Sequence, residues 1–157
     1  MRVFVDTNVP MYAGGKVSSY KVPCAKVLEL VAKESMEATT SSEVFQEILY
    51  RFWYLKEVDK GLAIFDHFGQ ILSDVLPVTL EDVKKARVLS EQYSDIPPRD
   101  LLHVATMINN QIDFIVSADK DFDGVSEIER VDPLDFENWF HRKQDKDGAS
   151  LTEWPKE

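Results

Sequence analysis

Residues 2–6 read RVFVD, and residues 113–119 read DFIVSAD. Each stretch is a short apolar run rich in β-branched residues, which is typical of a buried strand, and each ends on an aspartate, Asp6 or Asp119. Helical patterns lie between them, so the chain predicts a parallel sheet with helices on both faces. In such sheets ligands bind outside the carboxyl ends of the strands. We therefore expect both aspartates at one edge of one sheet.

The other elements follow from apolar periodicity and capping signals. Further short strands are expected at 37–41, 75–78 and 129–131. Residues 94–99 are expected to form a loop. The predicted helices share an amphipathic spacing and lie at 22–34, 41–58, 60–73, 80–93 and 100–111, with a terminal helix at 133–140.

Length and composition indicate one globular domain. We expect it to span residues 1–140 of the 157, and residues 141–157, which are polar apart from Trp154 and a few others, to form a flexible tail. No apolar run approaches the roughly 18 residues of a membrane span. The single cysteine, Cys24, excludes an internal disulfide, so a reducing, cytoplasmic location is expected.

The formal net charge of −10, from 28 acidic and 18 basic residues, argues against broad nonspecific binding to nucleic acid. It does not exclude a nuclease. A carboxylate cluster that holds divalent cations counts as negative in the formal sum, yet it binds phosphate once the cations are present.

Four acids stand at the start or in the first turns of elements, or at strand ends: Asp6, Glu47, Asp100 and Asp119. Taken singly, each is explained as a helix cap, a turn residue or a solvated acid. Carboxylates gathered at one sheet edge would repel each other unless a cation neutralised them. Oxygen ligands without paired histidine or cysteine suit Mg²⁺ or Mn²⁺ rather than Zn²⁺.

The order of four blocks resembles a known family. These are D-T-N at 6–8, a glutamate in the helix after T-S-S, R-D-L-L-H-V-A-T at 99–106 and I-V-S-A-D-K-D-F at 115–122. From about residue 2 to about 135 the chain resembles the PIN-domain nucleases, and within them the VapC-type toxins of toxin–antitoxin pairs. The resemblance implies a three-layer α/β sandwich with a central, mostly parallel sheet, and ribonuclease activity that depends on Mg²⁺ or Mn²⁺.

The resemblance also assigns roles by motif position. The expected catalytic and metal-binding residues are Asp6, Glu47, Asp100 and Asp119, supported by Asn8, Ser117 and Asp121. Glu43, one turn before Glu47, is a rival for the second acid. The implied partners are an RNA substrate, an antitoxin protein and a second copy of the chain in a homodimer, with no membrane.

Two alternatives stay open. A PIN-fold module that binds RNA or protein without cutting needs no metal. A phosphatase of the haloacid-dehalogenase type would use Asp6 as nucleophile, but it requires a second aspartate where Asn8 stands. His103 is expected either to pack against the sheet or to shuttle protons.

Surface contacts are predicted less specifically. Candidate cations for the RNA backbone are Lys21, Lys26, Arg51, Lys56 and Arg99, and candidate interface aromatics are Phe52, Trp53 and Tyr54.

Overall fold

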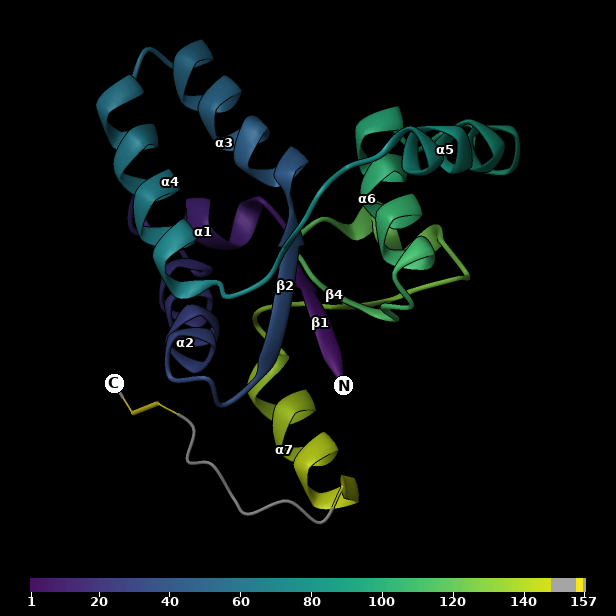
Figure 1. Cartoon of the computed structure of the whole chain (residues 1–157). Coiled ribbons are helices and arrows are strands. Elements are labelled where there is room, and N and C mark those ends of the chain that lie inside the picture. The colour runs from purple at the N-terminus through teal and green to yellow at the C-terminus, as the bar shows by residue number, and fades with distance from the viewer. Residues whose placement is uncertain (148–154, 157) are drawn as a thin grey trace.

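A five-stranded sheet lies at the centre of the computed structural model, which describes residues 1–147 and 155–156 (Figure 1). The strands run in the spatial order β3-β2-β1-β4-β5, and all four neighbouring pairs are parallel. Their bounds are β1 (Arg2–Val5), β2 (Glu37–Ser41), β3 (Val75–Leu76), β4 (Phe114–Val116) and β5 (Glu129–Val131). The predicted parallel sheet is therefore confirmed, and β1 is its central strand.

Helices cover both faces of this sheet. Figure 1 shows α1 to α4 on one side of β1 and β2, and the packed pair α5 and α6 on the other. The helices are α1 (Asn8–Ala13), α2 (Lys21–Ala32), α3 (Ser42–Tyr54), α4 (Val58–Ile71), α5 (Leu80–Gln92), α6 (Pro98–Asn109) and α7 (Phe136–Asp147), and a 3₁₀ turn, η1 (Lys120–Gly124), follows β4. The three-layer α/β architecture is as predicted.

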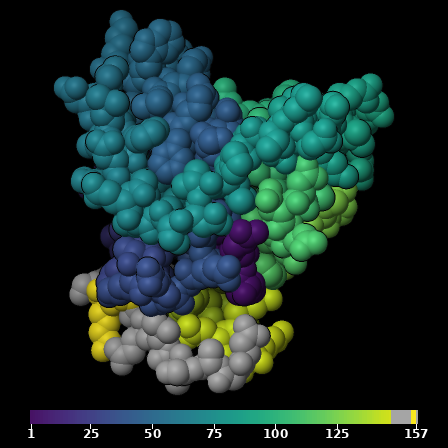
Figure 2. Space-filling model, in the orientation of Figure 1, coloured from purple at the N-terminus to yellow at the C-terminus, as the bar shows by residue number. Residues whose placement is uncertain are grey.

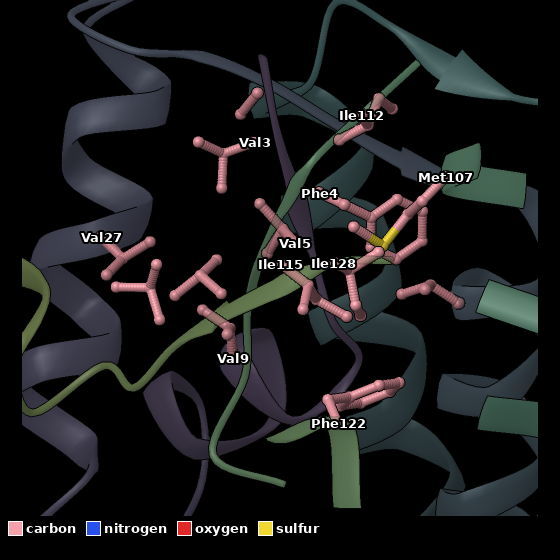
Figure 3. Close-up of a cluster of buried hydrophobic side chains, with 14 of the residues drawn as sticks. Val3, Phe4, Val5, Val9, Val27, Met107, Ile112, Ile115, Phe122 and Ile128 are labelled. Atoms are coloured by element: carbon pink, nitrogen blue, oxygen red, sulfur yellow. The ribbon is translucent and has the colours of Figure 1, made fainter. Parts of the chain in front are cut away.

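The central strand is apolar on both faces because both are covered. Val3, Phe4 and Val5 are completely buried, and alternate residues of a strand point to opposite faces. In Figure 3, Val27 of α2 lies on the side of Val3 and Val5, whereas Met107 of α6 lies beside Phe4. This double burial fixes the register of β1, and so fixes where the chain leaves the sheet at its carboxyl end.

The predicted helix over 41–58 is wrong at its end. α3 stops at Tyr54 and α4 starts at Val58, because Lys56 adopts a left-handed conformation with φ 58°. The amides of Lys56 and Glu57 close the helix on the carbonyls of Trp53 and Phe52, at 3.1 and 2.9 Å. Glycine normally occupies this position, so the sequence offers no stop signal there.

Two further boundaries differ from prediction. α6 begins at Pro98, inside the stretch 94–99 expected to be a loop, because proline suits the first turn of a helix. α7 continues to Asp147, seven residues past the predicted end at Phe140, so the expected domain boundary falls within a helix. The division into a nuclease domain and a tail stays a prediction, and Trp154 lies outside the described residues. Within the described part of the chain, no helix is both long and apolar enough to cross a membrane.

Candidate metal centre

The four predicted acids line one cavity at the carboxyl edge of the sheet. It has a volume of about 600 Å³, and its wall includes Asp6 after β1, Glu47 of α3, Asp100 in the first turn of α6 and Asp119 after β4. Figure 2 shows α3 and α4 standing apart from α5 and α6, so that the molecule is hollowed between the two helical pairs. Residues separated by more than 100 positions are thus brought to the same site.

Asp6 is buried and held by three donors. Its Oδ1 accepts a hydrogen bond from the Thr7 amide at 2.7 Å, and its Oδ2 accepts from Asn8 Nδ2 at 3.0 Å and Ser117 Oγ at 2.6 Å. Ser117 Oγ in turn accepts from the Asp119 amide at 3.0 Å. Asn8 and Ser117 therefore join the ends of β1 and β4, which is the arrangement expected of supporting residues.

Glu47 is also held at both of its oxygens. Oε2 accepts from Thr7 Oγ1 at 2.7 Å, and Oε1 lies 2.8 Å from Nε2 of the buried His103. Arg99 Nε lies 3.8 Å from the same Oε1. Glu47 lines the cavity, whereas its rival Glu43, one turn earlier on α3, is not among the described residues that line it.

The contacts of Thr7 and His103 with Glu47 were not predicted from the sequence. The signals were present, since Thr7 lies inside the D-T-N block and His103 lies one turn after Asp100. The His103 ring lies 5.6 Å from that of Phe4, against the sheet, and its Nε2 faces Glu47; a role in proton transfer stays a prediction.

Asp100, Asp119 and Asp121 each place one carboxylate oxygen within 4.8 Å of the other two. The Asp121 amide donates to Asp119 Oδ1 at 3.0 Å, which holds η1 against the end of β4. This all-oxygen donor set fits a hard divalent cation. Asp6 and Glu47 line the same cavity but are engaged by their own hydrogen-bond partners.

The pKa values reflect this crowding of charge. Burial, followed by the negative charges of Asp119 and Asp6, raises the pKa of Asp100 to about 7. Burial also raises the pKa of Asp6. For Glu47, burial acts to raise the pKa, but the hydrogen bond and charge of His103 outweigh it and the pKa is lowered. A cation at the cluster would offset both the burial and the repulsion that disfavour ionisation of Asp100.

Four cationic side chains line the same cavity as the carboxylates. They are Lys16, Arg51, Lys60 and Arg99. Arg51 and Arg99 were predicted as candidate RNA contacts, whereas Lys16 and Lys60 were not, because nothing in the sequence links their positions to the site. Lys21 Nζ instead donates to the Gly15 carbonyl at 2.7 Å. The cavity thus combines an acidic cluster with a basic wall, which suits a phosphate substrate bound together with a metal ion.

Comparisons with known proteins point to one family. Residues 3–128 match the model of the PIN domain. Ribonuclease VapC13 of Mycobacterium tuberculosis is 32% identical over 129 residues, covering 82% of this chain and 98% of the relative. Ribonuclease VapC23 of the same species is 33% identical over 106 residues, covering 66% and 81%.

Solved structures share the fold. VapBC2 from Rickettsia felis, bound to a promoter DNA fragment, has a TM-score of 0.66 at 21% identity and covers 84% of this chain and 98% of that one. VapC20 of Mycobacterium tuberculosis, a toxin that cleaves the sarcin-ricin loop, also has a TM-score of 0.66, at 18% identity, and covers 79% and 95%.

Proposed function

Because the chain belongs to the PIN domain family, we propose that it is a metal-dependent endoribonuclease and the toxin of a toxin–antitoxin pair. PIN nucleases use divalent cations, and we propose Mg²⁺ or Mn²⁺ as the ion in this protein. The substrate is an RNA phosphodiester. Asp6, Glu47, Asp100 and Asp119 form the catalytic set, with Asn8, Ser117 and Asp121 in supporting roles.

The observation that carries the proposal is the meeting of four distant carboxylates in one cavity. Asp6, Glu47, Asp100 and Asp119 come from four separate elements, yet all line the same wall. A fold that needed them only as caps or solvated acids would not gather them, because burial together with the charges of Asp119 and Asp6 raises the pKa of Asp100 and makes its ionisation unfavourable.

Different residues of the cavity have different proposed roles in the reaction. When bound, a divalent cation stabilises charge on the phosphoryl oxygens and promotes the ionisation of water. Asp100, Asp119 and Asp121, whose carboxylate oxygens lie within 4.8 Å of one another, would hold it. Asp6 and Glu47, which line the same cavity, would supply further oxygen ligands, and Arg51 and Arg99 would bind the phosphodiester. Water oxygen bonds to phosphorus as the P–O3′ bond breaks, leaving 5′ phosphate and 3′ hydroxyl ends.

Both alternatives are less well supported. The phosphatase alternative requires an acid at position 8, but Asn8 donates to Asp6 Oδ2 and so acts as a support for that carboxylate. A binding module without activity would have no need for the four acids, and relatives at 32–33% identity are named ribonucleases. We therefore favour the nuclease.

The test is substitution of Asp6, the most buried of the four acids. Asp6→Asn should lower RNA cleavage at least about 100-fold in Mg²⁺ or Mn²⁺, because a metal-site carboxylate is lost while the amide fills the same space. Its far-ultraviolet circular dichroism should match the wild type. Asp95→Asn, in the exposed loop before α6, is the matched control and should cleave normally. Wild-type cleavage by Asp6→Asn would overturn the proposal.

Two different surfaces suit the proposed protein partners. An antitoxin is expected to cover the acidic cavity, and an arginine inserted among the carboxylates would form strong paired hydrogen bonds there. For the homodimer, Trp53 and Tyr54 are suitable contacts because their side chains are 65% and 66% exposed, whereas Phe52 is buried in the core. Trp53→Ser with Tyr54→Ser should convert a dimer to a monomer in light scattering.

A further inference from the structure

Arg130 of β5 is a nearly buried arginine, 9% exposed, whose guanidinium makes four hydrogen bonds. Nε and Nη2 donate to the two carboxylate oxygens of Asp123, at 2.8 and 3.0 Å. Nη1 donates to the Ser117 carbonyl and to Asp132 Oδ2, both at 2.9 Å. The planar fork of arginine suits such a set of acceptors, which a lysine cannot match.

These contacts hold both ends of one short segment. Ser117 directly follows β4 and Asp123 lies in η1, so the contacts of one side chain hold both ends of residues 117–123. Between the two ends lie Asp119 and Asp121, two of the three acids whose oxygens cluster within 4.8 Å. Arg130 donates to neither of these in the structure, so its influence on them passes through the backbone of the segment.

We propose that Arg130 is a positioning residue for the cation site, which sets Asp119 and Asp121 in place by clamping the segment that carries them. The inference rests on the proposed function. Arg130 itself lies beyond residue 128, where the match to the PIN domain model ends, whereas Ser117 and Asp123, which it contacts, lie within the matched residues.

The far side of the clamp is anchored in turn. Asp132, which accepts from Arg130, also accepts from Tyr20 Oη at 3.0 Å, and its Oδ1 accepts from the Leu134 amide at 2.9 Å. Tyr20 precedes α2, so the guanidinium is tied to a second layer of the fold. Polar groups behind a metal ligand that fix its orientation typically change metal affinity or activity 10- to 100-fold when removed.

The charge of Arg130 and its clamping contacts have opposite expected effects on cation affinity, so substitutions can separate them. Arg130 is a positive group near a cation site, so loss of its charge alone should tighten cation binding. Loss of the clamp should weaken it. Arg130→Gln removes charge and clamp together, whereas Arg130→Lys keeps the charge and loses the fork. Arg87→Gln, which removes an exposed arginine paired with Glu91 on α5, is the matched control.

Two measurements on the full chain test the proposal. Mn²⁺ binding is followed by calorimetry, well below the unfolding temperature of every variant. We expect Arg130→Gln to weaken binding about 10-fold and Arg130→Lys to weaken it by a smaller factor, with Arg87→Gln unchanged. RNA cleavage by Arg130→Gln should recover toward the wild-type rate as Mn²⁺ is raised.

The second measurement uses the metal-free protein. The amides of Asp119 and Asp121 donate to Ser117 Oγ and Asp119 Oδ1. Their hydrogen exchange should accelerate at least about 10-fold in Arg130→Gln, while amides in the β1–β2 ladder keep the wild-type rate. Equal exchange rates, or tighter Mn²⁺ binding by Arg130→Gln, would overturn the clamp. If wild-type protein bound Mn²⁺ but cut no RNA, the proposed function would fail and the clamp would stand.

Discussion

Replacement of Asp100 by asparagine should make the metal-free protein more stable at pH 8. Burial and the charges of Asp119 and Asp6 raise the pKa of Asp100 from 3.8 to about 7. An acid whose pKa is higher in the folded than in the unfolded state keeps its proton on folding, so the fold loses stability as pH rises between the two values. The loss of folding stability caused by ionisation of Asp100 begins near pH 4 and is complete above pH 7.

The expected size follows from that shift. About three pKa units correspond to roughly 4 kcal/mol if the shift is fully realised. Asp100 is only partly buried, so solvent screens its charge, and we expect Asp100→Asn to gain about 1–2 kcal/mol at pH 8. This is a rise of about 3–6 °C in melting temperature for a domain of this size. At pH 5.5, about midway between the two pKa values, roughly half of the gain should remain.

Urea unfolding in EDTA at pH 5.5 and pH 8 measures both quantities. Glu91→Gln removes an exposed carboxylate from α5 and should change stability by less than about 0.5 kcal/mol at either pH. A variant less stable than wild type at pH 8, or a gain of the same size at both pH values, would refute the reasoning. On addition of Mn²⁺ the order should reverse, because wild type gains binding energy that the asparagine variant has largely lost.

His103→Leu should cost about 1–3 kcal/mol, because it removes the 2.8 Å partner of Glu47 Oε1, and His103→Gln should recover part of the loss. The pKa of His103 is raised, because its contacts with Glu47 and Asp6 outweigh the effect of burial. In urea unfolding, the stability lost by His103→Leu should therefore be largest below pH 6.5 and should shrink as pH rises through the raised pKa of the folded state. Gly61→Ala should cost about 1–3 kcal/mol, because its Cβ would lie 2.5 Å from Phe52 Cβ. Gly69→Ala on the same helix meets only ordinary contacts at 3.6 Å and should stabilise α4 slightly; equal melting temperatures for the two would contradict the packing argument.

The sheet and the acids at its edge were predictable because their signals are local. An apolar run that ends on a carboxylate marks both the strand and the site, as at Asp6 and Asp119. Helix ends were less predictable where the expected residue type was missing. Glu34, Lys56 and Gln111 all adopt positive φ near the ends of helices, where a glycine would have marked the stop.

The side chains that hold the acids in place could not be predicted from the sequence, for a different reason. Thr7 and His103 meet Glu47 across 40 and 56 residues, and Arg130 reaches back to Ser117 across the β4–β5 connection. Such polar contacts leave no periodic trace in a sequence. They appear only when the sheet order is known, because that order decides which strand ends become neighbours.

The pairing of β1 with β4 has a consequence during synthesis. Val3 lies opposite Phe114, so β1 can pair with β4 only after more than 100 further residues have been translated. A chain still emerging from the ribosome carries Asp6 long before it has Asp119, which is residue 119 of 157, and Arg130 comes later still. The acidic cavity can therefore assemble only after most of the chain has been synthesised.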